Sequence, residues 1–201
     1  MLADLLVGYA DRDGVTVLAL PRGGVPVAAP IALALKAPLD ILAVRKLGVP
    51  GHEELAMGAL AEGGVRVVNA DVVAGLGISE AMIDAATAAA AGPLADQEIR
   101  FRGTRTPVPH AGRCIVLVDD GLATGATMEA AIVSCRQAGA AWITVAVPVG
   151  APATVARLAT LADDLICPLQ PGSFRAVGLA YADFSPVADS EVVALLVTAR
   201  S

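Results

Sequence analysis

The residues best suited to chemistry lie in one short segment, residues 115–128. An apolar run ends in two adjacent carboxylates, Asp119 and Asp120, and a loop of glycine, alanine and threonine then opens into an expected helix. Small residues let backbone N–H groups close around a phosphate, and the helix start adds its dipole and unpaired donors. The hydroxyls of Thr124 and Thr127 are further donors, and a hydrogen bond to a charged group contributes about 1.5–3 kcal/mol.

The paired carboxylates indicate which phosphate this loop would bind. A loop that bound phosphate alone would gain nothing from two negative charges beside it. They suit a sugar phosphate whose hydroxyls need acceptors, with a divalent cation nearby to offset the charge. The segment has neither the lysine nor the spacing of a Walker A loop. An Asp-Asp-Gly turn that caps a helix in any α/β protein is the alternative interpretation.

Six apolar runs predict the strands that would position this segment. Most are continuous in valine, isoleucine and leucine, as expected for parallel strands covered on both faces. Strands that alternate with helices predict a doubly wound, mostly parallel α/β sheet, whose ligands bind beyond the carboxyl ends of the strands. The expected strands are residues 15–20, 39–44, 65–68, 114–118, 142–147 and 165–169. The expected helices are residues 25–36, 80–91, 94–102, 127–138 and 153–162, with an interruption at Gly92 and Pro93.

The segment 115–128 resembles the signature of type I phosphoribosyltransferases, which bind 5-phosphoribosyl-1-pyrophosphate (PRPP). In that signature, four apolar residues and two acids precede a loop that ends Thr-Gly-x-Thr. The resemblance implies that Asp119 and Asp120 are catalytic, hold the ribose hydroxyls and contact Mg²⁺ indirectly, through PRPP or water. It also implies a cradle for the 5′-phosphate, made of Ala123, Thr124, Gly125, Ala126 and Thr127.

The turn after the first expected strand resembles the pyrophosphate loop of the same family. Arg22, Gly23 and Gly24 stand there, and the resemblance implies that they bind the pyrophosphate of PRPP. We expect a cis peptide bond between Pro21 and Arg22. The alternative is an ordinary glycine turn with a surface arginine.

The residues after the second expected strand resemble the start of the family's mobile catalytic loop. Arg45 and Lys46 stand there, before residues 47–54. The resemblance implies that both cations are catalytic, and a solvated basic pair is the alternative. In an acidic chain, Arg22, Arg45 and Lys46 would form the local positive field that a pyrophosphate needs.

The rest of the chain is assigned by the same resemblance, which points to a poorly characterised bacterial branch of the family. We expect one domain over residues 1–201, with a core at about 1–69 and 111–169. A helical insertion is expected at about 70–110 and a small C-terminal hood at about 170–201.

In purine-using members of the family the hood stacks an aromatic ring on the base. Phe174 is the first candidate for that ring and Tyr181 the second; the alternative is that these aromatics fill the core. Hypoxanthine-guanine enzymes carry an aspartate where this chain has Ala123, which disfavours a 6-oxopurine acceptor. Another carboxylate could substitute, and the candidates are Glu53, Glu54 and Glu98.

Composition narrows the partners. A net charge of −6 and 3% aromatic residues argue against a nucleic-acid surface, which needs basic clusters and stacking rings. The longest uncharged stretch, residues 138–156, is broken by glycines and prolines, so we expect no membrane span. The start of the chain does not resemble a secretory signal, and we expect a cytoplasmic protein.

The three cysteines lack metal-ligand spacing and predict free thiols.

These expectations combine into one activity. It is Mg²⁺-dependent transfer of a phosphoribosyl group from PRPP to a nitrogenous base with release of pyrophosphate, by a homodimer as the family resemblance implies. A non-catalytic PRPP-binding regulator is an alternative of a different class. An unrelated α/β sugar-phosphate binder is a third.

Overall fold

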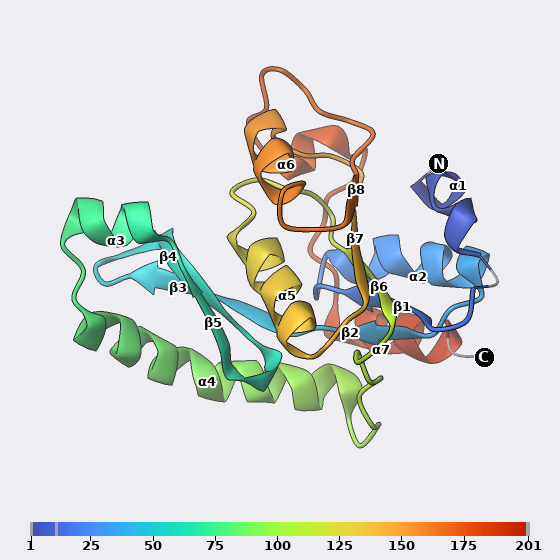
Figure 1. The fold of residues 1–201 in the computed structure, drawn as a ribbon, viewed down its shortest axis with the longest axis horizontal. Coiled ribbons are helices and arrows are strands. Elements are labelled where there is room, and N and C mark those ends of the chain that lie inside the picture. The colour runs from blue at the N-terminus through green and yellow to red at the C-terminus, as the bar shows by residue number, and fades with distance from the viewer. Residues whose placement is uncertain (1, 11, 200–201) are drawn as a thin grey trace.

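A five-stranded parallel sheet forms the centre of the computed structural model, which describes residues 2–10 and 12–199 (Figure 1). The order of its strands is β2-β1-β6-β7-β8. Every residue of β1 is buried, and so is every residue of β6 except Cys114, as expected for strands covered on both faces. The strands are β1 (Val15–Ala19), β2 (Leu39–Ile41), β6 (Cys114–Val118), β7 (Trp142–Ala146) and β8 (Asp164–Ile166).

Helices cover both faces of this sheet (Figure 1), so the doubly wound, mostly parallel α/β fold is confirmed. Successive strand residues point to opposite faces. Leu18 therefore packs in the core beneath α5 (Ala126–Gln137) and α6 (Pro152–Leu158). Val17 packs in the core on the other face. That face is covered by α1 (Leu2–Leu5), α2 (Gly24–Leu35) and α7 (Asp189–Thr198).

A second, antiparallel sheet is the small hood of the fold, and in Figure 1 it projects to the left of the parallel sheet. Its core includes Leu47 and Met57 from the sheet and Ile83 and Leu94 from a long helix. The strands are β3 (Val44–Val49), β4 (His52–Ala61) and β5 (Val65–Val68). The short 3-10 turn η2 (Glu62–Gly64) links β4 to β5, and α3 (Ala70–Leu76) and α4 (Glu80–Arg102) follow.

Residues 44–61 differ from expectation, because a hairpin stands where a mobile loop was expected at residues 47–54. The glycines and the proline of this stretch are typical of a loop, but β3 pairs along its length with the apolar strand β4. The register shifts on both sides of Gly48, so the irregularity is absorbed as a β-bulge. Only Pro50 and Gly51 remain as the turn, where Gly51 has φ +78°.

Helix α4 also differs, because Pro93 lies inside it and does not interrupt it. A proline within a helix removes one hydrogen bond and crowds the preceding turn. Ile83 is buried before the proline, and Leu94 and Phe101 are buried after it, so packing holds both halves in line. Helix α7 lies in a segment where no individual helix was expected, whereas α3 falls within the range 70–110 where helical structure was expected.

The end of α4 ties the two sheets together through one buried arginine. Arg102 donates to both carboxylate oxygens of Glu62, at 2.8 and 2.9 Å, beside the hood sheet. It also donates to the Ile41 carbonyl at 2.9 Å and lies 3.4 Å from Asp40 Oδ1, both in β2 of the parallel sheet. Burial lowers the pKa of Arg102, but the two carboxylates outweigh it, so the pKa is raised and the guanidinium stays charged.

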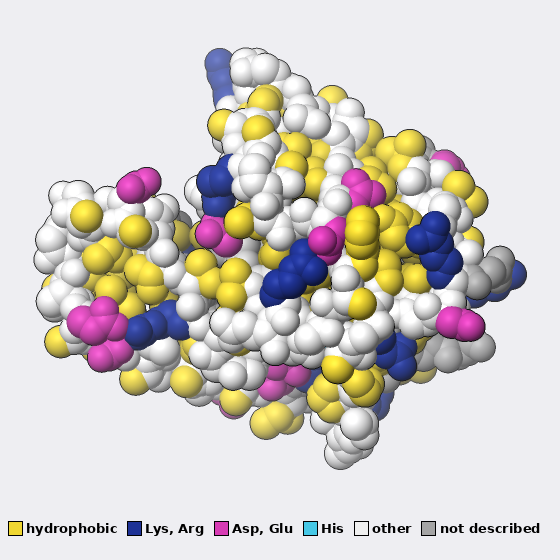
Figure 2. Space-filling model, in the orientation of Figure 1, with side chains coloured by type: hydrophobic (Ala, Val, Ile, Leu, Met, Phe, Trp, Pro, Cys, Tyr) yellow, Lys and Arg dark blue, Asp and Glu magenta, His cyan; other side chains and the backbone are white. Residues whose placement is uncertain are grey.

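The remaining bulk features concern the surface and the thiols. In the part of the chain that is described, no helix is both long and apolar enough to cross a bilayer. On the face seen in Figure 2, basic side chains are scattered among acidic ones and form no continuous stripe. Cys114, Cys135 and Cys167 are free thiols, as expected, and burial raises the pKa of Cys135 to about 12.

Residues 170–199 contain the 3-10 turn η3 (Val177–Ala180) and helix α7. Residues 70–102 are mostly helical, in α3 and α4. The hood role of the C-terminal segment and the insertion at 70–110 stay predictions.

Candidate active site

The candidate site lies where the chain reverses direction across the parallel sheet, between β1 and β6. From β1 the chain continues outward to β2, whereas from β6 it continues to β7 and β8 on the other side. Ligands of open α/β sheets bind at such a point, beyond the carboxyl ends of the strands. The loops that follow β1 and β6 both lie there, since Leu20 N–H donates to the Val118 carbonyl at 2.9 Å.

Gly23 and Gly24 allow the loop after β1 to contact the loop after β6. A Cβ atom at Gly23 would overlap the Asp120 carboxylate, and one at Gly24 would lie 2.6 Å from the Val118 carbonyl oxygen. A side chain at Gly23 would therefore displace the Asp120 carboxylate, and one at Gly24 would push the two loops apart. The peptide bond between Pro21 and Arg22 is cis, as expected.

Residues 123–127 form an open backbone cradle at the start of α5. Gly125, with φ +76°, stands before the first helical residue, and a conformation of this kind favours glycine. Two side chains of α6 hold the cradle from outside: Thr154 Oγ1 donates to the Ala123 carbonyl at 2.6 Å, and Arg157 Nη2 to the Thr124 carbonyl at 2.9 Å. In the described residues no group accepts a hydrogen bond from the N–H groups of residues 123–127, which leaves them for an anion.

The two carboxylates lie shortly before the cradle, and their ionised forms are disfavoured there. Asp119 Oδ1 accepts a hydrogen bond from Asp120 N–H at 2.9 Å. Burial, reinforced by the charge of Asp120, raises the pKa of Asp119 to about 8, and burial also raises the pKa of Asp120. No arginine or lysine of the described chain forms an ion pair with either carboxylate. Cations or hydroxyl donors from a ligand would relieve this disadvantage.

The predicted cations line two clefts, of which one includes residues of the cradle. Arg22 and Arg45 line a cleft of about 340 Å³ together with Arg100 of α4. Lys46 lines a second cleft of about 570 Å³, which includes Thr124 of the cradle. Arg45 and Lys46 also share a third cleft, which lies between β3 and α4.

One carboxylate of α7 already contacts the first of these clefts. Asp189 accepts from Arg100 Nη1 at 3.0 Å and lies 3.4 Å from Arg22 Nη1. All three side chains are substantially exposed, which leaves them open to exchange with an incoming anion.

Tyr181 is the aromatic residue next to the carboxylates. Its hydroxyl donates to the Asp120 carbonyl at 2.6 Å, and its ring lies 5.2 Å from that of Phe184 in a tilted arrangement. Burial, with the charges of Asp120 and Asp119, raises its pKa to about 12. Phe174, the first candidate for a stacking ring, is half-buried in the segment before η3, and its role stays a prediction.

The three carboxylates that could substitute for the missing aspartate near the acceptor base are Glu53, Glu54 and Glu98. Glu98 has its pKa raised by burial, and the charges that act on it are those of Glu62 and Arg102. Those two residues form the joint between the sheets, so Glu98 lies near that joint. The side chains of Glu53 and Glu54 lie outside the described residues.

Several contacts that shape the site have no local signal in the sequence. Thr154, Arg157 and Asp189 reach it from α6 and α7, which are distant along the chain. Their types are common at helix surfaces, so only the packing of those helices reveals them. Tyr181 was considered as a stacking ring, not as the donor to Asp120.

This chain is similar to known proteins of one family. Residues 2–181 match the family described as "Phosphoribosyl transferase domain". A Mycobacterium tuberculosis protein (strain CDC 1551 / Oshkosh) with a provisional phosphoribosyl transferase name is 50% identical over 182 residues, 90% of this chain. The match spans 41% of that relative, less than half its length.

The crystal structure of TT1426 from Thermus thermophilus is similar along the whole chain. The TM-score is 0.83 at 37% sequence identity, and the match covers 100% of this chain and 96% of TT1426. The family match, which extends over most of the chain, coincides with the dicarboxylate, the cradle and the parallel sheet that carries them. This chain is therefore a member of the phosphoribosyl transferase domain family, with the type I fold.

Proposed function

We propose that this protein transfers the phosphoribosyl group of PRPP to a nitrogenous base in a Mg²⁺-dependent reaction that releases pyrophosphate. One observation carries the proposal: the unused N–H groups of residues 123–127 directly follow two carboxylates that lack a cation. Such N–H groups suit the 5′-phosphate, and the carboxylates suit the ribose hydroxyls. Because the chain spans 41% of its curated relatives, the proposal concerns this domain's site alone.

The reaction needs positioning and electrostatics more than covalent help from the protein. A ring nitrogen of the base donates its lone pair to C1 of the ribose, and the bond from C1 to the pyrophosphate oxygen breaks. The electron pair leaves with pyrophosphate, and the ring N–H proton passes to solvent. Asp119 and Asp120 stabilise the positive charge that develops on the sugar, while Arg22, Arg45 and Lys46 neutralise the leaving group.

A Mg²⁺ ion fits the donors at this edge of the sheet. Asp119 and Asp120 offer the oxygen ligands that Mg²⁺ prefers. Among the described residues, no three histidine, cysteine or carboxylate side chains cluster to cage a metal. If Mg²⁺ binds here, substrate oxygens and water would supply most of its ligands, with the two carboxylates nearby. When bound, Mg²⁺ supplies positive charge that stabilises the pyrophosphate.

The test is pyrophosphate release from Mg²⁺ and PRPP, with and without a mixed panel of purine and pyrimidine bases. We expect base-dependent release that falls about tenfold or more in Asp120→Asn, because a neutral amide binds the ribose hydroxyls and the cation less strongly. Asp13→Asn is the matched control, since Asp13 is exposed beyond the opposite end of β1.

Two other results would decide against the enzyme. PRPP binding by calorimetry without release in any mixture would favour the non-catalytic regulator. Release at the wild-type rate in both Asp119→Asn and Asp120→Asn would remove the carboxylates from the mechanism. The homodimer is a separate proposal, which light scattering of the purified protein checks.

A further inference from the structure

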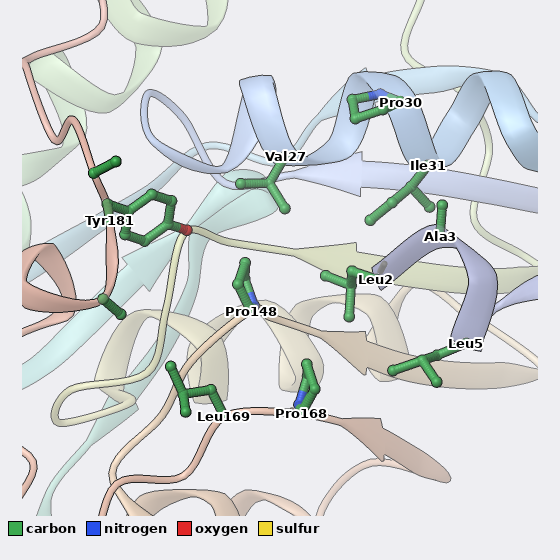
Figure 3. Close-up of a pocket in the computed structure, with 12 residues that line it drawn as sticks. Leu2, Ala3, Leu5, Val27, Pro30, Ile31, Pro148, Pro168, Leu169 and Tyr181 are labelled. Atoms are coloured by element: carbon green, nitrogen blue, oxygen red, sulfur yellow. The ribbon is translucent and has the colours of Figure 1, made fainter.

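A large apolar cavity of about 700 Å³ lies beside the candidate active site (Figure 3). Figure 3 shows Val27 and Ile31 of α2 along one side, and Pro148, Pro168 and Leu169 along the other. Tyr181 stands at one end of the cavity, and α1 closes the other. The volume is in the range of about 300–1,000 Å³ that is usual for sites that bind small molecules.

The strand register places this cavity at the same edge of the sheet as the carboxylates. Val118 of β6 pairs with Ala146 of β7, and Ala146 pairs with Ile166 of β8. Two residues beyond this line, the three parallel strands lead to Asp120, Pro148 and Pro168. The cavity wall therefore continues directly from the dicarboxylate along the carboxyl ends of neighbouring strands.

Tyr181 connects the cavity to the dicarboxylate. Its ring lines the cavity, and its hydroxyl donates to the Asp120 carbonyl at 2.6 Å. Because the phenol proton is used in that bond, the phenol oxygen keeps lone pairs that can accept one N–H from a ligand. A ligand bonded to the Tyr181 hydroxyl would thus lie near Asp120, whose carbonyl accepts the proton of that hydroxyl.

The lining offers a ligand almost nothing else that is polar. Every described lining side chain is that of alanine, valine, leucine, isoleucine, proline or tyrosine. Pro148 and Pro168 also lack a backbone N–H. A buried oxo or amino group of a ligand would lose its hydrogen bonds to water without replacing them, which is unfavourable.

We propose that this cavity binds the base that accepts the phosphoribosyl group, and that the base is a flat, largely apolar nitrogen heterocycle with a single N–H group. The inference rests on the proposed function for its link to PRPP. It names an acceptor class different from the oxo- and amino-substituted purines. The N–H would bond to Tyr181, while the ring body fills the space between α2 and the ends of β7 and β8.

The test uses benzimidazole and hypoxanthine, two bicyclic heterocycles of similar size that differ in polar groups. Their binding to the whole protein is measured by calorimetry. We expect benzimidazole to bind about tenfold or more tightly than hypoxanthine, because the cavity leaves the oxo group of hypoxanthine without a donor. Equal binding, or tighter binding of hypoxanthine, would overturn the assignment.

Variants establish whether binding takes place in this cavity. Val27→Trp would fill it, and Leu169→Arg, at a position that is 46% exposed, would place a charge in it without burying new bulk. We expect each to weaken benzimidazole about tenfold or more. Leu33→Trp is the matched control, since Leu33 lies on the same helix but is 74% exposed. Unchanged benzimidazole binding in Leu169→Arg would refute the site.

Binding of Mg²⁺ and PRPP, measured separately, distinguishes the two levels of the proposal. If PRPP binds in an Asp120-dependent manner but benzimidazole does not bind, the acceptor inference fails and the transferase proposal stands. If benzimidazole binds in the cavity but PRPP does not bind at all, the transferase proposal fails and the acceptor role fails with it.

Discussion

The two sheets contribute to the candidate site in different ways. Strands β1 and β6 of the parallel sheet are buried almost throughout, and the loops after them carry the dicarboxylate and the cradle. Strand β3 of the antiparallel sheet carries exposed as well as buried residues, and Arg45 and Lys46 occupy exposed positions on it. The groups suited to the ribose phosphate are therefore fixed by a two-sided core. The charges suited to the pyrophosphate stand on a sheet that is only partly covered.

The joint between the sheets should show the largest effect on stability. We expect Arg102→Met to lower the free energy of unfolding by about 3–5 kcal/mol, because it removes the buried guanidinium that bridges Asp40 and Glu62. Urea denaturation followed by circular dichroism measures the change. Arg136→Met, which breaks an exposed pair with Asp163, should lose only about 0–1 kcal/mol. Equal losses in the two variants would mean that Arg102 does not join the sheets.

A smaller effect should separate the two sheets in ligand binding. We expect the double variant Arg45→Ala, Lys46→Ala to weaken PRPP about tenfold, since exposed cations contribute modestly to binding of a charged group. Ribose 5-phosphate, which has no pyrophosphate, should be weakened less than PRPP, because the N–H groups of the cradle are intact although Lys46 shares a cleft with Thr124. Calorimetry with both ligands measures this difference.

Arg66→Ala is the control for that experiment, because Arg66 is also exposed on the antiparallel sheet but pairs with Glu80 and Asp84. A double variant that weakened ribose 5-phosphate as much as PRPP would show that the hood sheet holds the cradle as well. The division between the two sheets would then be wrong.

The last prediction concerns the pH dependence of stability and of ligand binding. The raised pKa of Asp119, about 8 against 3.8 ordinarily, means that the folded protein binds this proton more tightly than the unfolded chain. The free energy of unfolding should therefore fall as pH rises from about 4 to about 8. Mg²⁺ and PRPP favour the ionised carboxylate, so their binding should release a proton and strengthen by at most about tenfold per pH unit up to about pH 8.

Asp119→Asn tests this directly. The amide oxygen can still accept the hydrogen bond from Asp120 N–H, but it cannot titrate. We expect this variant to lose the part of the pH dependence that belongs to Asp119, in thermal unfolding and in PRPP calorimetry alike. A variant with the wild-type pH dependence would assign the proton to another group.

Local features of the site could be predicted from the sequence, whereas its long-range contacts could not. The dicarboxylate and the cradle occupy one continuous segment, 119–127, so their residue types and order reveal them. The buried strands of the parallel sheet could also be predicted, because continuous runs of valine, isoleucine and leucine are typical of strands covered on both faces.

The hairpin of β3 and β4 was missed because its stability comes from pairing between strands, which outweighs the turn-forming residues around Gly48 and Pro50. Helix α4 likewise continues through Pro93 because of packing on both sides of it. The apolar cavity is the extreme case. Its lining comes from α1, α2, the ends of two strands and residues 180–182. Because these segments are far apart in the sequence, no local sequence pattern predicts the cavity.

The contact between Gly23 and Asp120 has a consequence for how this site can change over time. A side chain at position 23 would occupy the space of the carboxylate at position 120, so a change at position 23 constrains the residue at position 120. Once Asp120 is replaced by a smaller residue, Gly23 can be substituted as well. If Gly23 is substituted first, the Asp120 carboxylate no longer fits. Natural variants of this domain that carry a side chain at position 23 should therefore lack the acid at position 120, and this pattern would mark descendants that have given up the ribose site.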